Sequence, residues 1–235
     1  MKVIILAGGY GTRISEETDT KPKPMVLIGD KPIIWHLMNS FSVQGFNEFI
    51  IAAGYLGNVI SEYADNLETE WNIKVVDTGL NTLTGGRIKR CIEADTSERF
   101  LVTYGDGLGN VCLSNLLKHH ILMKKIATVT SVRPPARFGV LEKENGLVTH
   151  FGEKRQTDVG WINGGYFVLE REIATYISGD SSSFEVDVMP KLANERALAA
   201  YEHDGFWQPM DTLREKNFLA ELADLSPQPW LLTKT

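Results

Sequence analysis

Short apolar runs alternate with amphipathic stretches along the first half of the chain. The runs are rich in β-branched residues, which is typical of buried strands, and they span residues 3–6, 48–53, 73–76, 100–104 and 127–132. Between them, apolar residues at helical spacing predict helices over residues 33–41, 56–67, 86–94 and 113–124. Strands that alternate with helices indicate βαβ units, and therefore a mostly parallel sheet with helices on both faces.

The pattern changes after residue 132. Segments 139–142 and 147–151 flank Asn145-Gly146, and this pair predicts a hairpin turn because both positions accept a positive φ. A further strand is predicted over residues 165–169, and helices over residues 171–177, 184–194 and 213–222. We therefore expect an α/β fold with a mixed, mostly parallel central sheet and a small antiparallel β extension.

Composition narrows the class of protein. The 235 residues are 43% hydrophobic and carry a formal net charge of −6, which fits a globular protein and argues against nucleic-acid or polybasic membrane binding. Cys91 and Cys112 are too few for a disulfide framework, so we expect free thiols. The apolar start of the chain is too short for a signal peptide, and no apolar run approaches the roughly 20 residues of a membrane span, so we expect a cytoplasmic protein.

A glycine-rich turn follows the first predicted strand. Gly8, Gly9 and Gly11 allow backbone N–H groups to approach an anion, and Arg13 can bind phosphate oxygens with its guanidinium. The turn is not a dinucleotide fingerprint, because Ile14 stands where a third glycine would be, and it lacks the Gly-Lys-Ser/Thr of a P-loop. It predicts either a phosphate site or an ordinary tight turn.

Two further basic segments allow two interpretations each. Prolines on both sides of Lys23 make a stiff, extended loop, which either holds this lysine at a defined point or is a solvated basic loop. Gly85 and Gly86 precede Arg87 at a predicted helix start, where the backbone either approaches a flat ligand such as a base or simply begins the helix.

Two aspartates are candidate metal ligands. Asp106 follows a buried strand between two glycines, so it lies at the carboxyl edge of the sheet, where ligands bind in α/β proteins. One carboxylate together with phosphate oxygens is a common Mg²⁺ arrangement, and Asp211 could complete a pair with Asp106. The alternatives are a turn aspartate at Asp106 and a helix N-cap at Asp211 or Thr212.

Candidate sugar-binding residues in the second half are less distinctive. Asn163 with Gly164 and Gly165 could contact a polyol or form a turn. Glu185 and Asp187 could accept hydroxyl hydrogen bonds or be charges in the first turn of a helix. Lys154 is a candidate phosphate partner or a solvated charge, and Trp207 is a core residue or a ligand contact.

Taken together, these segments resemble the sugar-1-phosphate nucleotidyltransferases. Four of them carry the resemblance: ILAGGYGTR at 5–13, KPKPM at 21–25, TGGRIKR at 84–90 and GFWQPMDTLR at 205–214. The first two are similar to the broad family, and the last two are similar to its cytidylyl branch. The resemblance covers the chain from residue 1 to about residue 222. It implies a Rossmann-like fold in one domain, residues 1–235, with a nucleotide part over about 1–110 and a sugar-phosphate part over about 111–235.

The resemblance also implies an activity. The protein would transfer CMP from CTP to a sugar 1-phosphate, with glucose 1-phosphate as the first expectation, and it would use Mg²⁺ and form a homo-oligomer. UTP or GTP, another acceptor phosphate, or a non-catalytic nucleotide-sugar-binding subunit are the alternatives.

Residue roles follow from the matching positions. Arg13, Lys23, Asp106 and Asp211 would be catalytic, and the two aspartates would hold the metal. The other implied nucleotide contacts are Leu6, Ala7, Gly8, Gly9, Gly11, Thr12, Thr78, Gly85, Gly86 and Arg87. The implied sugar-phosphate contacts are Tyr104, Gly139, Lys154, Asn163, Gly164, Glu185, Asp187 and Trp207.

Two departures from the family pattern concern assembly and the acceptor. Similar proteins carry an insertion of some two dozen residues near residues 68–73, where this chain is short. Arg155 follows Lys154 where the family usually has proline, and the segment 184–190 is also altered. The nucleotide half therefore matches the family better than the acceptor half.

Overall fold

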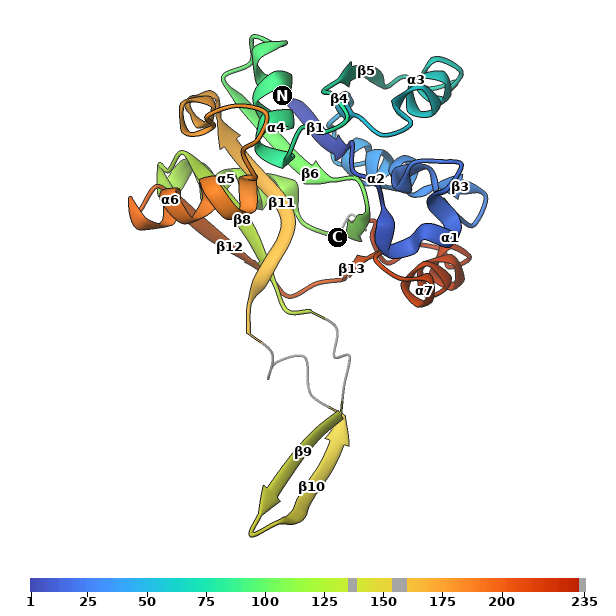
Figure 1. Ribbon diagram of the computed structural model, residues 1–235, viewed down its shortest axis with the longest axis vertical. Helices are drawn as coiled ribbons and strands as arrows, with labels where there is room; N and C mark the ends of the chain where they lie inside the picture. Colours follow the sequence, from blue (N-terminus) through green and yellow to red (C-terminus); the bar gives the residue numbers. More distant parts are fainter. Residues whose placement is uncertain (135–138, 154–159, 233–235) are drawn as a thin grey trace.

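A seven-stranded sheet forms the centre of the computed structural model, which describes residues 1–134, 139–153 and 160–232 (Figure 1). The strand order is β12-β8-β11-β6-β1-β4-β5. Neighbouring strands are parallel except where β11 pairs with β6 and β8, so the expected mixed, mostly parallel sheet is confirmed. In chain order the strands are β1 (Lys2–Ala7), β4 (Glu48–Ala53), β5 (Asn72–Asp77), β6 (Arg99–Tyr104), β8 (Ala127–Val132), β11 (Ile162–Glu170) and β12 (Leu198–His203).

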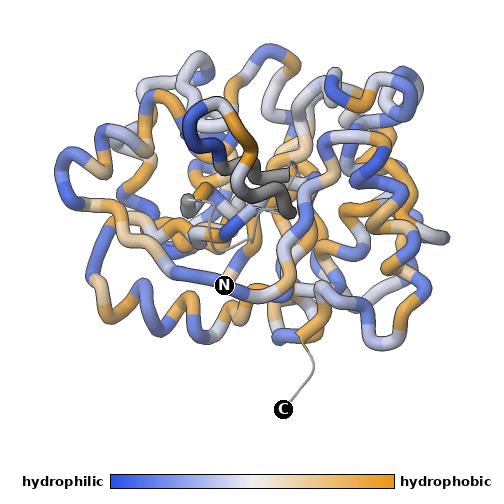
Figure 2. The backbone as a smooth tube through the Cα atoms, turned by 90° about the horizontal axis from the view of Figure 1, so that it is seen from below, coloured by the Kyte–Doolittle hydropathy of each residue, from blue (hydrophilic) through white to orange (hydrophobic). Residues whose placement is uncertain are grey.

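Two hydrophobic cores lie on opposite faces of this sheet. Val3 and Ile5 of β1 belong to one core and Ile4 and Leu6 to the other, as the alternation of side chains along a strand requires. The first core is covered by α2 (Ile33–Ser42), α3 (Gly57–Asp65), α5 (Leu113–Met123) and α7 (Leu213–Ala223). The second is covered by α4 (Thr84–Glu93), η4 (Arg171–Tyr176), η5 (Phe184–Val188) and α6 (Met189–Asn194). Figure 2 shows hydrophilic and hydrophobic positions interspersed along the backbone.

The helix predicted over residues 184–194 is divided in the structure. Residues Phe184–Val188 form a π-helical turn, and α6 follows with Pro190 in its first turn. Proline has no backbone N–H, so the regular hydrogen bond back to residue 186 cannot form, and one uniform α-helix was the wrong expectation. Residues 171–176 are likewise a 3₁₀ helix. The turn at 184–188 places Glu185 at the cavity described below.

Short strand pairs that sequence analysis missed determine the site. β7 (Gly107–Gly109) pairs antiparallel with β13 (Trp207–Pro209), and the N–H of Met210 donates to the carbonyl of Asp106 at 2.8 Å. This pairing brings Asp106 and Asp211 together although 105 residues separate them. The remaining small elements are η1 (Thr12–Ile14), α1 (Ser15–Thr18), η2 (Lys23–Met25), β2 (Leu27–Ile28) and β3 (Lys31–Pro32).

The predicted hairpin is present and projects from the rest of the molecule (Figure 1). β9 (Gly139–Glu144) pairs with β10 (Leu147–Glu153), and Asn145 and Gly146 both have positive φ, as the turn prediction requires. The connection between α3 and β5 has only the six residues 66–71, which agrees with the short segment noted in the sequence. Among the described residues, no helix is both long and apolar enough to cross a membrane.

Candidate active site

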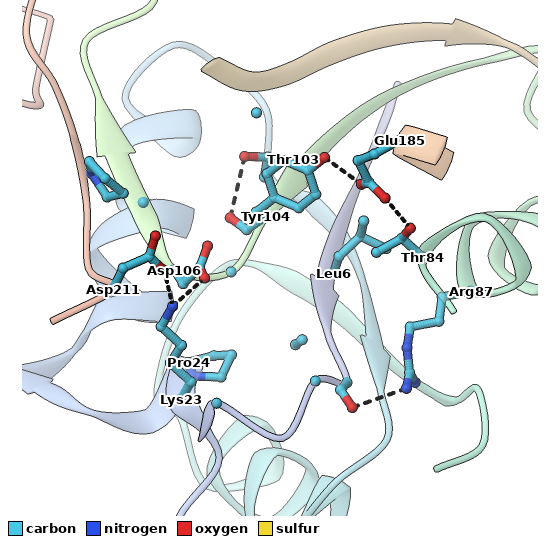
Figure 3. A pocket seen from close by; sticks show the side chains of 18 of the residues that line it. Leu6, Lys23, Pro24, Thr84, Arg87, Thr103, Tyr104, Asp106, Glu185 and Asp211 are labelled. Carbon is cyan, nitrogen blue, oxygen red and sulfur yellow. Dashed lines mark hydrogen bonds and ion pairs between the residues drawn. The ribbon is translucent and has the colours of Figure 1, made fainter. Parts of the chain in front are cut away.

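A cavity of about 1260 Å³ opens at the carboxyl ends of β1 and β6 (Figure 3). The glycine turn, residues 80–84, the start of β11 and the segment around Asp211 all line it. Its volume exceeds the range of roughly 300–1,000 Å³ that is usual for one small ligand. The cavity therefore has room for two substrates side by side, and residues from both halves of the chain form it.

Four charged groups meet at one end of the cavity. The Nζ of Lys23 lies 2.6 Å from Oδ2 of Asp106 and 2.7 Å from Oδ1 of Asp211 (Figure 3). The guanidinium of Arg13 lies 2.6 Å from Oδ2 of Asp211. The four residues expected to be catalytic are thus in direct contact, and the two positive charges balance the two negative ones.

Local structure explains why Asp211 points into the cavity. Thr212 is the N-cap of α7, with a complete capping box in which the Glu215 side chain binds the N-cap backbone. The sequence left open whether Asp211 or Thr212 caps this helix. The cap is Thr212, so the carboxylate of Asp211 is left for other partners.

The glycine turn is shaped by two different requirements. Gly11 has a φ of +69°, a conformation that L side chains rarely adopt. A Cβ on Gly8 would lie 2.1 Å from Nη1 of Arg87, so this glycine makes room for a protein side chain. A Cβ on Gly9 would meet no atom within 4 Å, which leaves the backbone there accessible from the cavity.

Lys23 and Arg13 differ in how firmly they are held. The side chain of Lys23 is only 8% exposed, and Pro22 and Pro24 fix the backbone on both sides of it. The side chain of Arg13 is 71% exposed, so its position depends mainly on its ion pair with Asp211.

The carboxylate pair fits a divalent cation. Asp106 and Asp211 present oxygen ligands to a common point, and the ammonium of Lys23 already stands between them as an internal cation. Within residues 1–134, 139–153 and 160–232, no group of three or more His, Cys, Asp or Glu residues forms a fuller protein cage. Two carboxylates without a cage suit Mg²⁺, which usually retains water and phosphate ligands.

The opposite end of the cavity holds a hydrogen-bonded carboxylate. The Tyr104 hydroxyl donates to Oε1 of Glu185 at 2.5 Å, and the Thr84 hydroxyl donates to Oε2 at 2.5 Å (Figure 3). Asn163 in turn donates to the Tyr104 hydroxyl at 3.2 Å. Burial and the negative Glu185 raise the pKa of Tyr104, so its hydroxyl stays protonated and remains a donor at neutral pH. Hydroxyl-bearing ligands suit such a surface.

Trp207 is fixed between the core and the cavity. Its Nε1 donates to the carbonyl of Gly164 at 2.7 Å, while its ring packs against the first core. Both residues line the cavity, so Trp207 is a core residue at the cavity wall and its expected ligand contact stays a prediction.

Arg87 and Thr78 are buried side chains, and Arg87 also lines the cavity. Arg87 is 4% exposed and Thr78 is fully buried. The Arg87 guanidinium donates to the hydroxyl of Thr78 and to the carbonyls of Gly8, Ala53, Gly79 and Leu80. Burial lowers the pKa of Arg87. Its donors join the glycine turn to the neighbouring loop, which gives Arg87 a structural role. The expected nucleotide contacts of Arg87 and Thr78 stay predictions.

Gly85 and Gly86 also face protein. A Cβ on Gly85 would lie 2.7 Å from the carbonyl oxygen of Ser182, and one on Gly86 would lie 2.6 Å from the Cα of Asp180. These glycines allow α4 to pack closely against the segment at 180–182. This packing gives both glycines a structural reason, and their expected approach to a base stays a prediction.

The other residues expected to contact the sugar phosphate are in different places. Asp187 does not line the cavity; its Oδ2 accepts from the backbone N–H of Ser183 at 2.7 Å, so the interpretation as a charge in the first turn holds. Gly139 begins β9. Lys154 and Arg155 lie outside the described residues.

Sequence reasoning missed Thr84 and the loop before it as parts of the cavity wall. Leu80, Asn81, Thr82 and Leu83 line the cavity, and the Tyr10 hydroxyl donates to Oδ1 of Asn81 at 3.3 Å. Thr84 begins the TGGRIKR segment, so its place in that motif was the available indication. No periodicity could have shown that its hydroxyl faces Glu185.

Comparisons with known proteins agree with this geometry. A family model described as "Nucleotidyl transferase" matches residues 2–216. A glucose-1-phosphate cytidylyltransferase of Salmonella typhi is 44% identical, with 98% of each chain covered, and a probable glucose-1-phosphate cytidylyltransferase of Bacillus subtilis is 38% identical, with 98% of this chain and 99% of the relative covered. The alignment with the Salmonella protein spans 253 positions, more than the 235 residues of this chain, as an insertion in the relative requires.

The fold agrees with solved structures as well. The structure of HddC from Yersinia pseudotuberculosis complexed with GMP-PN matches with a TM-score of 0.74 and 25% identity, covering 94% of this chain and 98% of that one. The family model and the full-length relatives lead to the same assignment: the chain belongs to the nucleotidyl transferase family.

Proposed function

We propose that this protein transfers CMP from CTP to a sugar 1-phosphate, with glucose 1-phosphate as the first candidate, and releases pyrophosphate. One observation carries the proposal: the cavity has two cations paired with two carboxylates at one end and a carboxylate that accepts hydroxyl hydrogen bonds at the other. The Salmonella and Bacillus relatives, named for this activity and matched over nearly their whole length, support the choice of CTP and glucose 1-phosphate.

The proposed reaction is an in-line displacement at phosphorus. An oxygen of the sugar 1-phosphate forms a bond to the α-phosphorus of CTP, and the bond from that phosphorus to the β-phosphate oxygen breaks. The attacking oxygen already carries negative charge near pH 7, so the step needs no protein base. Catalysis then consists of holding two anions together and offsetting their repulsion.

Positive groups at the carboxylate end meet that requirement. Arg13 binds the β- and γ-phosphates and Lys23 binds the α-phosphate, while the backbone at Gly9 and Gly11 follows the triphosphate. Asp106 and Asp211 hold Mg²⁺, which neutralises phosphate charge when it is bound. The other nucleotide contacts are the cavity-lining Leu6, Ala7 and Thr12.

Glu185, Tyr104 and Asn163 orient the sugar at the other end. Each lines the cavity and offers a donor or acceptor to sugar hydroxyls. Lys154 completes the proposal as the partner of the sugar phosphate. We also expect a homo-oligomer that works in the cytoplasm.

A nucleotide-by-sugar panel tests the proposal. Purified protein with Mg²⁺ is assayed for pyrophosphate release with CTP, UTP, GTP and ATP, each against several sugar 1-phosphates. We expect release with CTP and glucose 1-phosphate. Strong turnover with UTP or GTP alone would show that this nucleotide, and not CTP, is the substrate. No pyrophosphate release with any pair would favour a non-catalytic binding subunit.

Replacing Thr84 with valine should weaken sugar binding. The change keeps the side-chain shape but removes the hydroxyl that donates to Glu185 and accepts from the N–H of Phe184 at 2.9 Å. We expect KM for the sugar 1-phosphate to rise about tenfold, because a hydrogen bond to a charged group contributes about 1.5–3 kcal/mol. Thr84→Ser retains the hydroxyl and should stay near wild type. Equal KM values in wild type and Thr84→Val would contradict the role.

A further inference from the structure

Lys23 and Arg13, which are expected to bind phosphate, form ion pairs with the carboxylates that are expected to bind metal. We propose that, in the nucleotide-free protein, the ammonium of Lys23 occupies the position of the divalent cation and thereby prevents metal from binding alone. Metal and nucleotide then bind as a coupled pair, because the triphosphate removes Lys23 and Arg13 from the carboxylates. This inference rests on the proposed function, since it assumes that Asp106 and Asp211 are the metal ligands.

Geometry places Lys23 where a bridging metal would be. One Nζ atom contacts Asp106 at 2.6 Å and Asp211 at 2.7 Å, so it bridges one oxygen of each carboxylate. The same two oxygens are among those that Asp106 and Asp211 would offer to a divalent cation. An ammonium and a dication a few ångströms apart repel strongly in a partly buried site, so the two cations exclude each other.

The backbones at both aspartates are held by hydrogen bonds. The carbonyl of Asp106 accepts from the N–H of Met210 at 2.8 Å, and the N–H of Asp211 donates to Oε2 of Glu215 at 2.8 Å. The neighbouring prolines fix the backbone of Lys23 as well, but its ammonium is carried on a flexible four-carbon stem. When partners change, the ammonium therefore moves by a change of side-chain rotamer, without movement of these backbone segments.

Charge balance favours the exchange only when nucleotide arrives. In the free protein, the positive charges of Arg13 and Lys23 neutralise the two carboxylates. A metal ion that bound alone would displace Lys23 from these carboxylates and leave its ammonium without a negative partner. A triphosphate supplies new negative partners for both cations, and the carboxylates are then free for metal. By linkage, each ligand must raise the affinity for the other by the same factor.

Metal binding without nucleotide tests this exchange. The full-length protein is titrated with Mn²⁺, and free Mn²⁺ is measured by electron paramagnetic resonance for wild type, Lys23→Met and Lys23→Gln. We expect weak Mn²⁺ binding in wild type and at least tenfold tighter binding in both variants. Mn²⁺ should also raise the melting temperature of the variants clearly more than that of wild type.

Lys21→Met is the matched control. It removes the same charge two residues away, where Lys21 pairs with Glu17 at 3.6 Å outside the cavity lining, so its Mn²⁺ affinity should equal that of wild type. Adding Asp106→Asn to Lys23→Met should abolish the gained affinity.

Two results would overturn the exchange. One is wild-type protein that binds Mn²⁺ as tightly as the Lys23 variants, and the other is Lys23 variants that gain no affinity. Neither result bears on pyrophosphate release from CTP by wild type, so failure of this inference remains distinct from failure of the proposed function.

Discussion

Asp106→Asn should lower turnover of CTP and sugar 1-phosphate by about 10²–10³-fold, the usual loss for one electrostatic contact in a transition state. Asparagine keeps the size of the side chain but removes the charge that Lys23 balances and that the metal requires. The main-chain hydrogen bond from Met210 to residue 106 survives the change, so the fold should be retained. Steady-state kinetics at saturating Mg²⁺ measure the loss, and a thermal melt verifies folding.

Asp224→Asn provides the control for this variant. Asp224 is an exposed residue at the C-terminal end of α7, and its replacement removes one carboxylate from outside the cavity. Its kinetics should match wild type. Wild-type turnover in Asp106→Asn would contradict the assignment of Asp106 as a metal ligand. An unfolded Asp106→Asn protein would show that the residue is structural.

Arg87→Met should destabilise the protein by about 3–5 kcal/mol, because it leaves several buried oxygen atoms unpaired and each such loss costs about 1–3 kcal/mol. The guanidinium is the donor for five oxygen atoms around the glycine turn, and methionine can satisfy none of them. Nucleotide binding should weaken too, because the carbonyl of Gly8 loses the contact that ties the turn to the loop at 79–80. Urea denaturation measures the change in the free energy of unfolding.

Arg90→Met is the comparison for that measurement. Arg90 lies on the same helix but forms an exposed ion pair with Asp180 at 2.6 Å, which contributes little to stability. Its unfolding midpoint should stay near wild type. A midpoint for Arg87→Met equal to that of Arg90→Met would contradict the structural role of Arg87.

Periodicity predicted the central strands and most helices because each of them spans several residues with one buried face. It missed β7 and β13, which have three residues each and no pattern of their own. Their pairing is nevertheless what joins Asp106 to Asp211. The sequence indicated both aspartates as candidates, and only the fold shows that they are neighbours.

The structural role of Arg87 was missed for a related reason. An arginine after two glycines at a helix start looks like a ligand contact, and nothing local shows that the side chain is buried among carbonyl groups. The requirement for glycine at position 8 likewise comes from Arg87, 79 residues away. Lys23 was correctly placed at the site, but its contact with the carboxylates depends on three segments that sequence analysis treats separately.

Product analysis by ³¹P nuclear magnetic resonance tests the central claim most directly. Purified protein is incubated with CTP, glucose 1-phosphate and Mg²⁺, and with Asp106→Asn protein in parallel. We expect CDP-glucose and pyrophosphate to appear in equal amounts with wild type, and almost none with the variant. Unchanged CTP and glucose 1-phosphate after prolonged incubation with folded wild-type protein would contradict the proposal.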